Sequence, residues 1–98
     1  MTGVNGARGE VTAMLGGAER RLCLTLAALA EIETGLGVSG IAALGARMRV
    51  LSAGDLMVVL VALLRGGGED ALADDLGRAG VDPREAAEAV ARAFAAAA

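Results

Sequence analysis

Few residues in this 98-residue chain have side chains that could carry out catalysis. There is no histidine and there is one cysteine, Cys23, so the usual general base at neutral pH and an internal disulfide are both missing. No histidine or lysine lies near Cys23 in the sequence to activate its thiol. Asp74 and Asp75 are adjacent and point apart on a helix, which is typical of a solvated face and not of a metal site. We therefore expect no enzyme activity, no cofactor, and no catalytic or metal-ligating residue.

Two glycine clusters resemble nucleotide-binding motifs but lack their context. Gly35, Gly37 and Gly40 spell G-x-G-x-x-G, which binds dinucleotides only between a strand and a following helix. Here a predicted helix ends at the motif, so we interpret it as a helix cap and a turn. The glycines at 66–68 are not followed by Lys and Ser or Thr, as a phosphate-binding loop requires, and we interpret them as a hinge between helices.

Glu33 is the acidic residue with the least ordinary position. On a helical wheel it falls beside the apolar stripe, where a carboxylate needs a basic or backbone partner. Two interpretations stay open at this point: a rim residue held by an arginine or a backbone donor, and a residue that contacts a partner protein.

Composition argues against nucleic-acid and membrane partners. The net charge is −3, the pI is about 4.8, and one phenylalanine is the sole aromatic residue, so both a basic surface and stacking platforms for bases are lacking. The longest apolar run, at residues 56–64, is less than half of the roughly 20 residues of a transmembrane helix. We expect a cytoplasmic protein with residues 1–8 as a mobile leader and residues 9–98 as a single domain.

The first elements read as a β-hairpin near residues 9–25. Apolar and polar residues alternate on both sides of Gly16 and Gly17, which supply the positive φ angles of a tight turn. The alternation puts four side chains on one face, which helices must cover: Val11, Ala13, Leu22 and Leu24.

Helical spacing begins directly after the second strand. The first helix is expected to end at Gly37, and Ser39 is expected to cap the second helix. The core-facing stripes of these two helices are Leu26, Leu29, Ile32 and Leu36, and then Ile41, Leu44, Met48 and Leu51.

The third helix has the clearest start and the least ordinary surface. Ser52 and Asp55 form a capping box that opens it at Ala53, and it ends near Arg65. Its apolar residues surround the helix, so either the helix is central and buried or part of it is a docking surface. For the second case the candidate partner-binding residues are Leu56, Met57, Leu60, Leu63 and Leu64, with Met48 as an adaptable wall.

Two more helices complete the chain. Glu69 and Asp70 favour the start of the fourth, whose inner edge is Leu72 and Leu76 and which stops at Gly80. Asp82, Pro83 and Glu85 mark the start of the fifth, an Ala-rich helix on which Val90 and Phe94 are the large apolar residues. So thin a stripe allows either close packing on a neighbour or a free helix. The predicted fold is α+β and mainly α, with an N-terminal hairpin packed on about five short helices.

Three segments together resemble a known family. They are RGEV at residues 8–11, LCLTLAALAEIETGLG at residues 22–37 and LSAGDL at residues 51–56. These segments and their order along the chain are similar to those of the small tail-cluster proteins of phage-like gene transfer agents. Those proteins are often labelled tail tube proteins. The resemblance implies a role in tail morphogenesis, with other tail proteins as partners and self-association as a further contact.

The resemblance leaves three functions open. A small helical protein encoded between the tube and tape-measure genes is typically a tail assembly chaperone, which implies binding to the tape-measure protein in the producer cell. A structural tail tube component of the particle is the second function, although tube subunits resemble one another in using a β-sandwich, and this sequence has too few strand-like residues to build one. A small helical adaptor unrelated to tails is the third.

Overall fold

The chain begins, in the computed structural model, with the predicted hairpin. The structure describes residues 9–97, so the expected leader lies outside the described residues. Strands β1 (Glu10–Leu15) and β2 (Ala18–Cys23) pair antiparallel through the turn at Gly16 and Gly17, whose φ angles are 63° and 86°. Two successive positive φ angles are typical of the tight turn whose twist matches that of the strands.

One face of the hairpin forms part of the core. Val11 lies opposite Leu22, so Val11, Ala13 and Leu22 share a face as predicted, and Leu15 joins them. Leu15 and Leu22 are fully buried. Leu24 lies beyond the end of β2 and packs against the same core from the linker.

Helix α2 (Leu26–Leu36) has the predicted end but not the whole predicted inner face. The Thr25 side chain caps its start by accepting from the Ala28 amide at 3.0 Å. At its end, Gly37 has a φ of 70° as predicted. The prediction for Leu26 is wrong, since that residue is 83% exposed. It lies roughly 120° around the helix from the buried Ile32 and therefore points away from the core.

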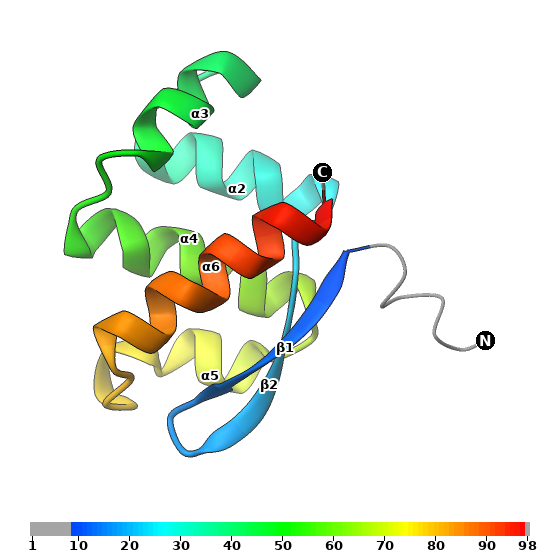
Figure 1. Cartoon of the computed structure of the whole chain (residues 1–98), viewed down its shortest axis with the longest axis vertical. Coiled ribbons are helices and arrows are strands. Elements are labelled where there is room, and N and C mark those ends of the chain that lie inside the picture. The colour runs from blue at the N-terminus through cyan, green and yellow to red at the C-terminus, as the bar shows by residue number, and fades with distance from the viewer. Residues whose placement is uncertain (1–8, 98) are drawn as a thin grey trace.

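Helix α3 (Ile41–Met48) stands apart from the other helices, at the top of Figure 1. The predicted cap is wrong: the N-cap is Gly40, with a φ of 90° and no side-chain cap bond. Of the predicted stripe, Leu44 is buried, Met48 is half-buried, and Ile41 is 77% exposed. Ile41 is exposed because no neighbouring helix covers the first turn of α3 tightly enough to bury it.

Helix α4 (Ala53–Gly66) is the central element. The predicted capping box is present, with the Ser52 Oγ accepting from the Asp55 amide at 3.1 Å and the Ser52 amide donating to Asp55 Oδ2 at 3.2 Å. The helix packs against α2, α6 and β2, which confirms the central alternative for most of its surface. Its buried residues are Val59, Leu60, Ala62, Leu63 and Leu64.

The glycines after α4 form a packed turn and not a free hinge. The Glu69 amide donates to the Leu64 carbonyl at 2.8 Å and the Gly68 amide to the Arg65 carbonyl at 3.0 Å, the two bonds of a Schellman motif. Gly66 and Gly67 lie so close to β2 that an added Cβ would be 2.1 Å from the Cys23 carbonyl oxygen and 2.2 Å from that of Arg21.

The predicted fourth helix is divided into α5 (Asp70–Asp74) and the short 3-10 helix η1 (Leu76–Arg78). Leu72 and Leu76 are buried, as predicted for its inner edge. After Gly80, with a φ of 68°, the Asp82 carboxylate accepts from the Arg84 amide at 2.8 Å at the start of α6 (Pro83–Ala97).

Helix α6 packs closely and does not swing free. It crosses the front of the molecule in Figure 1 and contacts β1, β2 and α4. Small side chains allow this approach: Ala86, Ala89 and Ala93 are buried together with Val90, while Phe94 is half-buried. Helices make up 63% and strands 13% of the described residues. The predicted class, α+β and mainly α with a hairpin on five helices, is therefore confirmed.

Candidate functional site

An apolar groove of about 680 Å³ lies between α3, the start of α4 and α6. Figure 1 shows the three helices that supply its walls. Its large apolar lining residues come from all three helices and from the α3–α4 linker, and they are Ile41, Leu44, Met48, Leu51, Leu56, Val90 and Phe94.

Two further hollows extend the groove. One, of about 460 Å³, lies at the start of α2 and shares Ile41, Leu44 and Phe94 with the groove. The other, of about 250 Å³, lies beside η1 and shares Ala53, Leu56 and Pro83 with it. The shared residues join the three hollows into one apolar band across this side of the molecule. Exposed apolar surface of this kind is typical of an interface with another protein.

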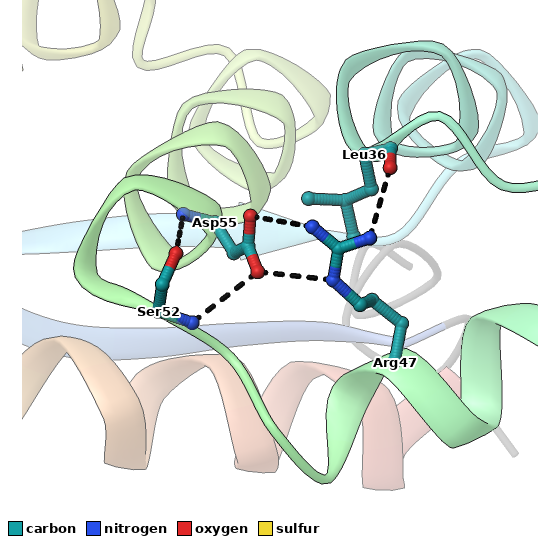
Figure 2. A network of polar contacts seen from close by, with 4 residues as sticks. All are labelled: Leu36, Arg47, Ser52 and Asp55. Atoms are coloured by element: carbon teal, nitrogen blue, oxygen red, sulfur yellow. Dashed lines mark hydrogen bonds and ion pairs between the residues drawn. The ribbon is translucent and has the colours of Figure 1, made fainter.

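Helix α3, which forms one wall, is attached near its C-terminal end by Arg47. Arg47 donates from Nε and one terminal nitrogen to the two oxygens of Asp55, at 3.0 and 2.9 Å, and from the other terminal nitrogen to the Leu36 carbonyl at 3.0 Å. Figure 2 shows these bonds together with the Ser52 capping box that holds Asp55 in place. The network, which we call the Arg47 clasp, ties α3 to the end of α2 and the start of α4. The clasp therefore helps to fix the position of this wall of the groove.

The charges of the clasp are mutually stabilised. The Arg47 guanidinium and, next, the Ser52 amide lower the pKa of Asp55 below its ordinary value of 3.8. The carboxylate is thus ionised at neutral pH and accepts from all of these donors at once.

The predicted partner-binding residues are divided by the structure. Met48 and Leu56 line the groove. Met57, which is 45% exposed, does not line the groove itself but lines a shallow hollow between α2 and α4 and the hollow beside η1. The expected exposure of Leu60, Leu63 and Leu64 is wrong, because all three are buried in the core as α4 is covered on several sides.

Several groove residues were not among those candidates. Ile41, Leu44, Val90 and Phe94 have the spacing of core stripes, and the sequence alone indicates burial for them. Helical spacing identifies an apolar face but does not say whether that face is covered, so only the placement of α3 could distinguish the groove from the core.

Glu33 has the backbone partner that its position predicts. Its side chain is half-buried and accepts from the Gly40 amide at 2.9 Å, beside the start of α3. Glu31, on the other side of α2, pairs with Arg65, which also lies 3.6 Å from Asp74. These acids stabilise links between elements, and the partner-binding interpretation of Glu33 stays a prediction.

Other kinds of site have little support among residues 9–97. No group of three metal-ligating side chains comes together within that range. Burial and, to a smaller extent, the Glu10 carboxylate raise the pKa of the Cys23 thiol, so it is not an activated nucleophile. No single helix in the described chain is long and apolar enough to cross a membrane, and α2 and α3 pass that test only as a pair bent by 67°.

Comparison with known proteins identifies the family. No curated protein and no solved structure matches the chain. A family model described as phage tail tube protein, GTA-gp10, matches residues 8–98. This match covers the hairpin, all of the described helices and the groove, and it confirms the resemblance carried by residues 8–11, 22–37 and 51–56. The chain therefore belongs to this family of gene transfer agent tail proteins.

Proposed function

We propose that this protein is a tail assembly chaperone that binds the tape-measure protein of its own particle in the apolar groove between α3, α4 and α6. The observation that carries the proposal is the groove itself, about 680 Å³ in volume and lined mainly by aliphatic side chains. Its family is one of tail proteins and not of enzymes, so other tail proteins are the natural partners.

The shape and lining of the groove favour a helix as its occupant. Ile41, Leu44 and Met48 lie at helical spacing on one wall, and Val90 and Phe94 do so on the other. Two helical walls with apolar ridges accept the apolar face of an amphipathic helix, which inserts side chains at similar spacing. Met48 adds a flexible side chain that adapts to different apolar residues. A mostly helical, apolar client is therefore the chemistry that fits.

The second candidate is a structural role in the tail tube, which the description of the family as a phage tail tube protein favours. The strand content supports the chaperone instead. Within residues 9–97 the sheet has two strands of six residues each. A β-sandwich wall needs several strands in each of its two sheets, whereas the described part of this chain supplies one hairpin.

Purified particles distinguish the two roles. A chaperone acts in the cytoplasm of the producer cell and is displaced during assembly, so we expect this chain to be nearly absent from particles analysed by quantitative mass spectrometry. A tube subunit is among the most abundant tail components. A copy number similar to that of the major tail protein would overturn the chaperone proposal.

Substitution of Ile41 tests the groove separately. Ile41→Glu puts a carboxylate where the client's apolar face would lie, and we expect at least about tenfold weaker binding to the tape-measure protein in a pull-down or calorimetric titration. The fold should be unaffected, since Ile41 is 77% exposed.

Val50→Glu is the matched control for Ile41→Glu. Val50 is 72% exposed, follows α3 and lines none of the three hollows. Equal binding by Ile41→Glu and Val50→Glu would exclude the groove as the client site. A tape-measure protein that binds neither variant nor the unchanged chain would favour an adaptor role.

A further inference from the structure

The hydrogen-bond pattern of the hairpin shows which backbone groups point away from it. Thr12 lies opposite Arg21, and the Arg21 amide donates to Glu69 Oε2 at 3.0 Å. Thr12 and Arg21 are therefore a pair that does not exchange bonds. Because bonded and non-bonded pairs alternate in an antiparallel ladder, the N–H and C=O groups of Glu10, Thr12 and Met14 point outward from β1.

The outer edge of β2 is covered by the protein itself. The Glu69 carboxylate accepts a hydrogen bond from the Arg21 amide and also lies 3.7 Å from the Arg21 guanidinium. Gly66 and Gly67 press against the carbonyls of Cys23 and Arg21 so closely that no side chain fits between them. This edge has no room for another strand.

Helix α6 packs against β1, but the hydrogen-bonding groups on the outer edge of β1 have no partner among the described residues. Within residues 9–97 no hydrogen bond joins the outward backbone groups of Thr12 or Met14 to another element. Thr12 is exposed, and Met14 is 57% exposed. Since buried backbone groups are almost always paired, these groups face solvent and are available to a further strand.

Strand β1 also lacks the features that keep edge strands from pairing. Its sequence, EVTAML, has no lysine and no proline, and its pairing with β2 continues without a bulge. Val11 and Ala13 on its inner face are half-buried. A third strand would cover the exposed part of both side chains.

We propose that β1 is a self-association surface and that its occupant is β1 of a second copy of this chain. An antiparallel pair centred on Thr12 places Thr12 opposite itself, so that the outward groups of Glu10 in each copy meet those of Met14 in the other. No like charges face each other directly, because Glu10 is the one charged residue of β1. On the inner face Val11 meets Ala13, so both apolar rows continue through a four-stranded sheet.

Charges introduced at Thr12, the residue that lies opposite itself in the proposed pair, test this register. The unchanged chain should form a dimer of twice the 9.7 kDa of one chain in sedimentation or light-scattering measurements. Thr12→Lys and Thr12→Glu each place like charges opposite one another, and each alone should shift the protein toward monomer. Mixing the two variants in equal amounts should restore a dimer that contains one chain of each kind.

A comparison of Thr12→Pro with Thr12→Val separates the effect of losing a backbone N–H from the effect of changing the side chain. Thr12→Pro removes the outward N–H, which the hairpin does not use, and should weaken the dimer about tenfold or more, whereas Thr12→Val should not. Circular dichroism must show that each variant is folded. If Thr12→Pro does not fold, the test rests on the mixing of Thr12→Lys with Thr12→Glu.

Three results would overturn the proposal: a monomeric unchanged chain at high protein concentration, a dimer indifferent to every Thr12 substitution, or no recovery on mixing. Ile41→Glu should leave the dimer intact. A result that overturns β1 self-association can therefore be distinguished from one that overturns client binding in the groove.

Discussion

Gly67 lies where the end of α4 meets the backbone of β2. Its φ of −90° is open to any residue, so conformational freedom does not explain the glycine. The glycine is explained by lack of space, because a Cβ there would be 2.2 Å from the Arg21 carbonyl oxygen and 2.5 Å from the carbonyl carbon. These are backbone atoms, which cannot move aside as the end of a flexible side chain can. The glycine lets helix and strand pack without a layer of side chains between them.

Replacing Gly67 should therefore destabilise the fold strongly. We expect Gly67→Ala to lower the free energy of unfolding by about 2 kcal/mol or more, measured by urea denaturation, because strand and helix must separate to admit the methyl group. Gly45 in α3 is the control, with nothing within 4 Å of an added Cβ. Gly45→Ala should raise stability by about 0.5–1 kcal/mol through helix propensity. Similar stabilities of the two variants would contradict the close-approach explanation.

At the scale of elements, α3 differs from the other helices in how it is held. It has no side-chain N-cap, its first residue is exposed, and Leu44 is its one buried residue. Its polar attachments are the bond from the Gly40 amide to Glu33 of α2 and the Arg47 clasp, which joins it to Asp55 of α4 and to the Leu36 carbonyl at the end of α2. The groove wall is thus the part of the described structure with the lowest expected local stability.

Removal of the clasp should release α3 without unfolding the rest. We expect Arg47→Gln to raise the amide hydrogen-exchange rate of residues 41–48 about tenfold, with little change in α4. Arg49 is the control, because it is exposed and forms no ion pair within the described chain. Arg49→Gln should exchange like the unchanged protein, and equal effects of the two substitutions would show that the clasp does not hold α3.

Acid should have the same effect as removing the arginine. The folded pKa of Asp55 is lowered, so the stability that it contributes is fully present above its ordinary value of 3.8 and is lost as the pH falls through the folded pKa. Exchange in α3 relative to α4 should rise below that pH in the unchanged protein. The rise should be absent in Arg47→Gln, which has already lost the ion pair.

At the scale of the whole molecule, α4 organises the core. Hairpin, α2, α5 and α6 all pack against it, and Val59, Leu60, Ala62, Leu63 and Leu64 are buried along its length. The expectation that Leu63 forms a docking surface is therefore replaced by a role in stability, while Met57 keeps an exposed position outside the groove.

Truncation of Leu63 and of Met57 to alanine should change the free energy of unfolding by different amounts, because Leu63 lies in the core and Met57 at the surface. Leu63→Ala should lower the free energy of unfolding by about 2–5 kcal/mol, because its side chain is fully buried and leaves a cavity. Met57→Ala, at 45% exposure, should cost less than about 1 kcal/mol. Urea denaturation followed by circular dichroism gives both values. A loss for Met57→Ala as large as that for Leu63→Ala would contradict this division.

Features that depend on near neighbours in the chain could be predicted from the sequence. Turn glycines 16 and 17, the Ser52 capping box and the αL residue Gly37 all act through bonds or angles within a few residues, so local pattern was sufficient to place the hairpin and most helix ends. Ser39 is not the cap, because Gly40 has a non-helical φ of 90° and is itself the N-cap, with its amide donating to Glu33 of the preceding helix.

Which apolar residues are covered could not be predicted in this way, because it depends on how the elements pack. Leu26 and Leu63 look alike in sequence, yet one is 83% exposed and the other is fully buried. Burial depends on which elements lie alongside, and that arrangement brings together residues far apart in the chain, as at Gly67 and Arg21. The groove arises in the same way: its walls on α3 and α6 are each an ordinary amphipathic face, and they face each other because of where α3 lies, tied by Arg47 to the end of α2 and the start of α4.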